Sequence, residues 1–107
     1  MIFSIGNHIE QIKAGTKTQT RRPTGRYRVG ETYAIQPGRG KKAIPEGRIL
    51  ITHMWIEGHW EKIHPIDAEA EGGYSVEEYE ELYSKMYPEW AGRWCYEFKY
   101  VPFDTLP

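Results

Sequence analysis

Apolar positions in this chain recur at the spacing of strands in some segments and at the spacing of helices in others. The most apolar segment is 48–56, where Ile49 and Ile51 would face one side of a strand and Leu50 and Met54 the other. Because both sides carry apolar residues, we expect this segment to be the central strand of a sheet that is covered on both faces.

A second long strand is predicted at 93–101, where four aromatic residues occupy every second position: Trp94, Tyr96, Phe98 and Tyr100. Shorter strands are expected at 2–5, directly before Pro23, and at 32–36. Pro23 ends its strand because proline has no backbone N–H to donate to a ladder.

Local start and stop signals predict the helices. The first spans 7–14, with Asn7 as its expected cap, and ends at Gly15, a residue suited to the left-handed conformation. A short second helix is expected over 66–71, stopped by Gly72-Gly73. A third over 75–87 opens with a Ser-x-x-Glu capping box, and its helical spacing places Tyr79 in an apolar stripe that faces the core. Together these elements predict an α+β fold, a small mixed barrel of five or six strands with two or three helices. We expect residues 1–107 to form one domain.

Charge is divided unevenly along the chain, although the net charge is only −1. The segment 13–48 holds ten Lys or Arg residues and two Glu, whereas 57–89 holds ten acidic residues and two Lys. This asymmetry is typical of a protein with one basic face for an anionic partner, but the two halves could equally neutralise each other across the fold. Without a membrane span or a leader pattern, we expect a cytoplasmic protein with no membrane partner.

The candidate chemistry lies in the stretch 15–22, Gly-Thr-Lys-Thr-Gln-Thr-Arg-Arg, which gathers an amine, hydroxyls and two guanidinium groups. On its own, such a stretch is common on an exposed strand edge. It is not a phosphate-binding loop of the nucleotide triphosphate type, because that motif requires glycine where this chain has Gln11 and Thr16.

Five of these residues, Gly15, Lys17, Thr18, Thr20 and Arg22, resemble the Gly-x-Lys-Thr-x-Thr-x-Arg signature of the ASCH domain, a PUA-like β-barrel family associated with RNA. The similarity continues in order through 68–71, a helix that ends near Tyr87-Pro88, and 96–99, as in the short bacterial ASCH proteins that are N4-acetylcytidine amidohydrolases. It spans roughly residues 9 to 101, with the strongest identity in the first motif.

The resemblance implies a catalytic set of Lys17, Thr20 and Glu71 acting on a small-molecule nucleoside. The residue types suit the reaction, since an amide needs an attacking oxygen, a base and an acid for the leaving nitrogen. Thr20 would attack, Lys17 would act as the base, and Glu71 would move a proton or hold the cytosine amino group.

Four further residues are candidates for substrate binding: Arg22, Thr18, Arg21 and Trp60. Arg22 would stabilise an oxyanion or hold a sugar or phosphate. Trp60 would stack on a base, although a half-buried loop aromatic is the commoner outcome. By default we expect Arg21 to be exposed to solvent.

No cofactor or metal is expected. Cys95 is the sole cysteine, which excludes an internal disulfide and a cysteine-based zinc site. His59 and His64 are a weak metal signal because no third ligand of suitable spacing accompanies them.

Two conditions apply to this site. In a regular strand Lys17 and Thr20 would point to opposite faces, so the pair requires a bulge, a turn or a helix end between them. The signs acting on the pKa of Lys17 also conflict, because burial and neighbouring arginines lower it while an ionised Glu71 raises it. If Glu71 contacts Lys17 directly, we expect Lys17 to be mostly charged at rest.

The sequence leaves two classes of function open. One is the amidohydrolase; the other is a binding module that holds RNA through its basic half, with RNA cleavage as a related third possibility. The basic loop 37–42 fits a phosphate site as well as a solvated hairpin tip. Glu71 favours the enzyme, since a carboxylate would repel RNA. Oligomeric state is not predicted.

Overall fold

The structure is a computed structural model that describes residues 1–103. Its elements are α1 (His8–Ala14), β1 (Gln19–Arg22), β2 (Thr32–Ala34), β3 (Gly47–Gly58), α2 (Pro65–Gly72), α3 (Val76–Met86) and β4 (Gly92–Pro102). Within the described range, none of the helices has the length and apolar character required to cross a membrane.

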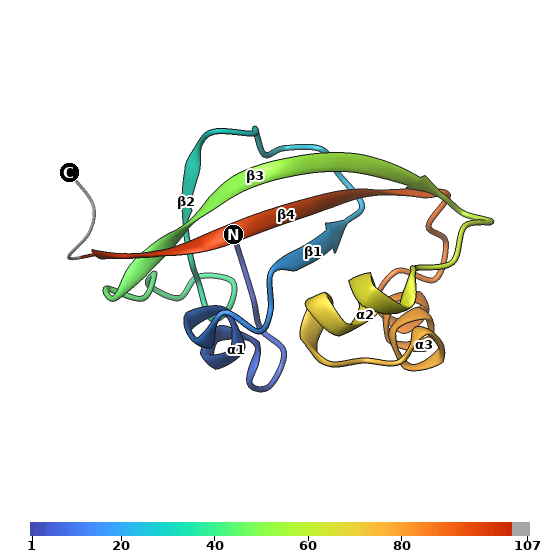
Figure 1. Ribbon diagram of the computed structural model, residues 1–107, viewed down its shortest axis with the longest axis horizontal. Coiled ribbons are helices and arrows are strands. Elements are labelled where there is room, and N and C mark those ends of the chain that lie inside the picture. Colours follow the sequence, from blue (N-terminus) through green and yellow to red (C-terminus); the bar gives the residue numbers. More distant parts are fainter. Residues whose placement is uncertain (104–107) are drawn as a thin grey trace.

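The strands form one antiparallel sheet in the order β1-β4-β3-β2. The long strands β3 and β4 pair over almost their whole lengths, and all three helices lie on one side of them (Figure 1). The α+β prediction is confirmed, but the described part of the chain has four strands rather than five or six. The segment expected as the first strand forms only an isolated parallel bridge between Ile2 and Gln36, because the chain turns at Gly6 into α1.

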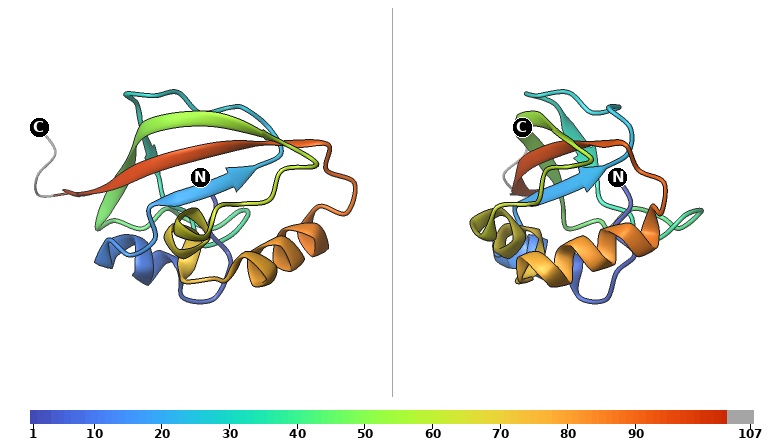
Figure 2. Two further views of the ribbon diagram at one scale, coloured as in Figure 1. Left: turned by 45° about the vertical axis from the view of Figure 1, so that its right-hand side comes forward. Right: turned by 90° about the vertical axis from the view of Figure 1, so that its right-hand side faces the viewer.

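The strand expected at 48–56 is inside the sheet, but its outer face is not covered. Ile49 and Ile51 are fully buried, whereas Met54 and Ile56 are exposed. A register irregularity lies between Ile51 and His53, where β3 is bulged against β4. Beyond this bulge the strand bends over the helices, so that only one of its faces is packed (Figure 2).

The interior consists of two apolar clusters. The first lies between the sheet, α1 and the N-terminal segment and comprises Met1, Phe3, Ile12, Ile35, Ile49, Ile51, Tyr96 and Phe98. The second belongs to α2, α3 and the loop before them and comprises Ile63, Ala68, Tyr79 and Tyr83. Buried charged residues lie where β1 and β4 meet α2 and α3, so a polar layer connects the helices to the sheet.

Local signals predicted the helix ends well. Gly15 and Gly73 end α1 and α2 with φ of 80° and 82°, in the left-handed region. Ser75 and Glu78 form both bonds of the capping box at the start of α3. The expected side-chain cap from Asn7 is absent.

At Gly47, β3 lies so close to β4 that there is no room for a side chain. A Cβ there would lie 2.5 Å from the Val101 carbonyl oxygen and 2.7 Å from the Tyr100 hydroxyl, so the backbone would have to shift. We expect Gly47→Ala to lower the free energy of unfolding by about 1–3 kcal/mol in urea denaturation. Gly92→Ala is the control, because its Cβ would meet only the Glu57 carbonyl oxygen at 3.5 Å. We expect a change below about 0.5 kcal/mol for that variant, and equal losses in both would contradict this account.

Candidate active site

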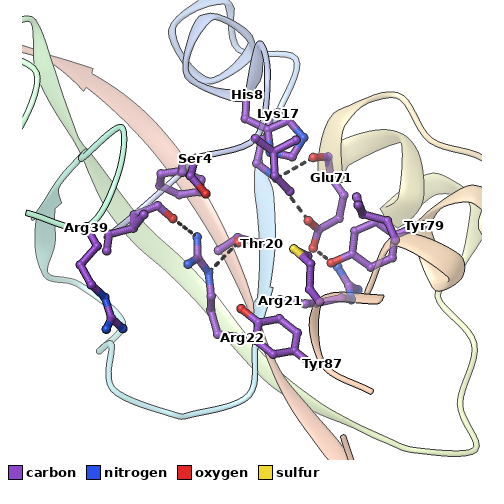
Figure 3. A pocket seen from close by; sticks show the side chains of 15 residues that line it. Ser4, His8, Lys17, Thr20, Arg21, Arg22, Arg39, Glu71, Tyr79 and Tyr87 are labelled. Atoms are coloured by element: carbon purple, nitrogen blue, oxygen red, sulfur yellow. Dashed lines mark hydrogen bonds and ion pairs between the residues drawn. The ribbon is translucent and has the colours of Figure 1, made fainter. Parts of the chain in front are cut away.

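A cavity of about 360 Å³ opens between β1, the N-terminal segment and the helices α2 and α3 (Figure 3). This volume falls within the range of small-molecule sites. Its polar and charged lining residues come from segments far apart in sequence: Ser4, His8, Lys17, Thr20, Arg21, Arg22, Arg39, Glu71, Tyr79 and Tyr87.

The turn after α1 brings Lys17 into this cavity. The backbone N–H groups of Thr16 and Lys17 both donate to the Gln11 carbonyl oxygen, at 2.9 and 3.1 Å, which extends the helix end past Gly15. The regular strand β1 begins only at Gln19. Lys17 therefore precedes the strand, and its side chain does not follow the alternation of strand residues between two faces. Lys17 and Thr20 line the same cavity, as a catalytic pair requires.

The ammonium group of Lys17 is enclosed by acceptors. Its Nζ donates to the carbonyl oxygens of Gln19 and Glu71 and to Glu71 Oε1 at 3.2 Å, and the residue is only 2% exposed. Three acceptors match the three N–H bonds of a charged lysine, whereas a neutral amine would turn its lone pair toward an oxygen. This geometry indicates that Lys17 is protonated at rest.

Burial lowers the pKa of Lys17 from its ordinary value, because water can no longer solvate the charge. Glu71 opposes this effect through its charge and its hydrogen bond, while Arg22 and Arg21 add to the lowering. Lys17 is thus easier to deprotonate than a surface lysine, and Glu71 is the group that keeps it charged.

Glu71, near the C-terminus of α2, is buried between two cations. Its Oε1 accepts from Lys17 and its Oε2 accepts from Arg21 Nη1 at 2.9 Å. A carboxylate offers about four lone-pair directions, so acceptor capacity remains for a ligand. The structure therefore brings Glu71 into the cleft beside Lys17, across fifty-three intervening positions of sequence.

Arg21 is not exposed as expected; it is 3% exposed and fully paired. Its Nε and Nη2 donate to the two carboxylate oxygens of Glu57, at 3.0 and 2.8 Å. Such a fork-shaped pair is strong and directional. Glu57 on β3 and Glu71 on α2 together supply the counter-charges that allow this arginine to face the interior.

The pairing continues from Glu57 to Arg93, which the sequence did not single out. Arg93 donates from Nε to Glu57 Oε1 at 2.9 Å and from Nη1 to Glu80 Oε1 of α3 at 2.7 Å. Its guanidinium carbon lies 4.5 Å from the ring centre of Trp90. Because Arg21 and Arg93 stabilise its anion, the pKa of Glu57 is lowered to about 2, against the cost of burial.

Thr20 and Arg22 form the second part of the cavity wall (Figure 3). Arg22 Nε donates to Thr20 Oγ1 at 3.1 Å, and its Nη2 donates to the Ile2 carbonyl oxygen at 2.7 Å. The guanidinium group also lies over the Phe3 ring, 4.9 Å from its centre. Arg22 is therefore fixed beside the only hydroxyl of the signature that lines the cavity.

Thr18 and Trp60 do not line the cavity. Thr18 connects elements through its backbone, donating to the Ala70 carbonyl oxygen and accepting from the Phe98 N–H, both at 2.8 Å. Trp60 is 83% exposed on the turn after β3, so it is neither the half-buried aromatic expected nor part of this site.

The histidines considered as metal ligands have other partners. The ring of His59 is bonded to the Trp90 carbonyl oxygen at 2.7 Å, and His64 caps α2 by accepting from the Ile66 N–H. Within residues 1–103, no group of three or more His, Cys, Asp and Glu side chains is placed to hold a metal ion.

Four polar residues of the cavity wall were not identified from the sequence: Ser4, His8, Tyr79 and Tyr87. Tyr79 was predicted as a core residue from its helical spacing, and it is buried, although it also contacts the cavity. His8 had no sequence signal beyond its residue type, because only the tertiary fold places it near Lys17. Arg39 belongs to the basic loop 37–42, which the sequence already marked as a candidate phosphate site.

Comparison with known proteins supports the fold. No protein-family model and no curated protein matches this chain. Protein EF3133 from Enterococcus faecalis V583, of the family DUF984, is similar in structure with a TM-score of 0.70 and 19% identity, over 87% of this chain and 66% of that one. Protein PH0355 gives a TM-score of 0.71 with 19% identity, over 94% and 96% of the two chains. An ASCH domain from Lactobacillus crispatus JV V101 gives 0.64 with 16% identity, over 89% and 70%. The fold is thus ASCH-like.

The buried side chain of His8 should make the stability of the fold depend on pH. Its Nε2 lies 2.7 Å from the Tyr74 hydroxyl, and burial, with the charges of Lys17 and Arg22, lowers its pKa from 6.5 to about 4. Below pH 6.5 the unfolded chain binds a proton here that the folded chain does not, so stability falls as the pH drops from 6.5 towards 4. We expect this group to account for a loss of roughly 3 kcal/mol, measured by urea unfolding at a series of pH values.

The variant His8→Gln should lack this step while keeping the loss expected from Glu57, which lies between pH 4.5 and about 2. An unchanged decline between pH 6.5 and 4 in the variant would show that another group is responsible.

Proposed function

We propose that this chain is an ASCH-type, PUA-like amidohydrolase that converts N4-acylated cytosine nucleosides, such as N4-acetylcytidine, into the nucleoside and a carboxylate. The observation that carries the proposal is the buried pair of Lys17 and Glu71, with Nζ and Oε1 3.2 Å apart, in a cavity that also presents the Thr20 hydroxyl. The reaction requires water as co-substrate and draws on no cofactor.

The pair holds one proton that can occupy either residue. At rest it belongs to Lys17, as the three acceptors around Nζ indicate. Passed to Glu71, the same proton leaves an amine on Lys17 and a carboxylic acid on Glu71, which are the base and the acid that amide cleavage needs. Burial favours this exchange because it removes two charges from a poorly solvated site, although the contact from Arg21 to Glu71 opposes it.

Acyl transfer then follows with a balanced proton count. Thr20 Oγ1 attacks the acyl carbon and its proton passes to the Lys17 amine; the carbonyl electrons move onto oxygen. As the oxyanion collapses, the C–N4 bond breaks and N4 takes the proton from Glu71, which releases cytidine and restores the resting pair. Water then attacks the Thr20 ester, its proton passes to the Lys17 amine, and the Thr20 oxygen takes the proton from Glu71, which releases the carboxylic acid; the acid ionises in solvent.

Arg22 and Glu71 supply the remaining interactions in this scheme. Arg22, fixed beside Thr20, places positive charge where the oxyanion develops. The unused acceptor positions of Glu71 suit the N4–H of an acylated cytosine, since carboxylates accept from that group.

RNA binding without turnover is the second candidate, and a ribonuclease would reuse the same basic residues. The observation that favours RNA binding is the presence of Arg22 and Arg39 at the cavity, neither of which pairs with a carboxylate within residues 1–103. The position of Glu71 argues for the hydrolase, because a phosphate-binding cleft gains nothing from a buried carboxylate.

We predict that the purified protein releases cytidine from N4-acetylcytidine and that Thr20→Val lowers kcat/KM by at least about 100-fold, since the nucleophile is removed. Thr20→Ser keeps a hydroxyl and should retain activity within about tenfold. Lys17→Met and Glu71→Gln should each lose about 100-fold or more, because each destroys the acid–base pair. The measurement is chromatography of cytidine against time.

Thr16→Val is the matched control, since Thr16 is exposed and does not line the cavity. Its activity should be unchanged. If the intact protein gives no cytidine, or if Thr20→Val is as active as Thr20→Ser, the proposed reaction is wrong.

A further inference from the structure

Arg39 lies at the cavity without a partner among residues 1–103. It is exposed, forms no hydrogen bond or ion pair with any residue in 1–103, and lines the cavity on the side away from Glu71 and Tyr79 (Figure 3). The loop that carries it is held in place: Lys41 N–H donates to the Gly38 carbonyl oxygen at 3.2 Å, and the Gln36 side chain donates to the Lys41 carbonyl oxygen at 3.2 Å. A turn closed at both ends thus presents Arg39 to the cavity.

The charges of the cavity do not balance. Glu71 compensates Lys17, and Glu57 compensates Arg21 through two hydrogen bonds. Arg22 and Arg39 line the cavity without a carboxylate partner among the residues described. Two positive charges therefore remain for a ligand that carries negative charge.

The unpaired groups present hydrogen-bond donors that an oxyanion could accept. Arg22 commits Nε to Thr20 and Nη2 to Ile2, which leaves its Nη1 for a ligand, while all the donors of Arg39 are free of described partners. The exposed Ser4 hydroxyl lines the same side of the cavity. Arg39 can donate two parallel hydrogen bonds to a phosphate, which a lysine cannot, and Arg22 adds the donors of its Nη1.

We propose that the ligand of this cavity is a nucleotide: Arg39, with Arg22, binds the phosphate monoester of an acylated cytidine monophosphate while the acyl group faces Lys17 and Glu71. This rests on the proposed function for the reaction, but the phosphate site is testable without turnover. A free nucleoside would leave Arg39 with nothing to bind. A mononucleotide, with its charge concentrated on a terminal phosphate, compensates both arginines at once.

The test compares cytidine 5′-monophosphate with cytidine in calorimetric titrations, and N4-acetylcytidine 5′-monophosphate with N4-acetylcytidine in turnover. We expect the intact protein to bind the monophosphate at least roughly tenfold more tightly than cytidine. Arg39→Gln should reduce that ratio to about two or less, and added salt should weaken binding of the monophosphate but not of cytidine. Lys42→Gln, which removes one charge from the same loop without touching the cavity, should keep the ratio.

The outcomes separate this inference from the proposed reaction. Equal affinity for cytidine and its monophosphate, or a ratio unaffected by Arg39→Gln, would overturn the phosphate site even if N4-acetylcytidine is hydrolysed. Arg39-dependent binding of the monophosphate without any turnover would support the phosphate site and remove the proposed reaction. If a short cytidine-rich RNA binds more tightly than the monophosphate and depends on Arg39 in the same way, the mononucleotide proposal is wrong and RNA is the ligand.

Discussion

A buried chain of alternating charges, Lys17, Glu71, Arg21, Glu57 and Arg93, connects the helices of this protein to its sheet. The two apolar clusters lie on either side of it, so neither cluster by itself fixes α2 and α3 against β1. Removing one member of such a chain leaves a buried charge uncompensated and typically costs about 3–5 kcal/mol, although the intact chain contributes little net stability. Its main effect is positional: it sets where Glu71 lies relative to Lys17.

The same chain divides the cations of the cavity into two kinds. Lys17 and Arg21 are compensated inside the protein, which makes Lys17 responsive to its carboxylate partner and keeps Arg21 structural. Arg22 and Arg39 lack carboxylate partners in the described residues and belong to the ligand side of the cavity. In the two proposals, the reaction uses Lys17 and the ligand phosphate is bound by Arg22 and Arg39, and Thr20 lies between these groups in Figure 3.

How much the sequence could predict depended on the range of the interactions involved. The C-terminal ends of α1 and α2 and the start of α3 follow from glycines and a capping box, which act over a few residues, and these predictions are confirmed. The signature correctly placed Lys17, Thr20 and Arg22 at one site, because all three line the cavity. Their roles in a reaction stay predictions. The burial of Arg21 could not be foreseen, because its partners come from β3 and α2 and only the packed fold brings them together. The prediction of five or six strands was wrong for a similar reason. A strand-like pattern at 2–5 does not show whether a neighbouring strand is there to pair with it, and this segment forms only an isolated bridge.

The proposed reaction requires that the Glu71 carboxylate helps to keep the buried Lys17 charged, so that one proton can serve both residues. The most direct measurement is the titration of the Lys17 side-chain nitrogen by ¹⁵N NMR, in the intact protein and in Glu71→Gln. We expect a pKa below the ordinary lysine value of about 10.4, with a charged amine at neutral pH, and a further fall in the variant. A pKa at or above the ordinary value, or one that does not respond to Glu71→Gln, would contradict it.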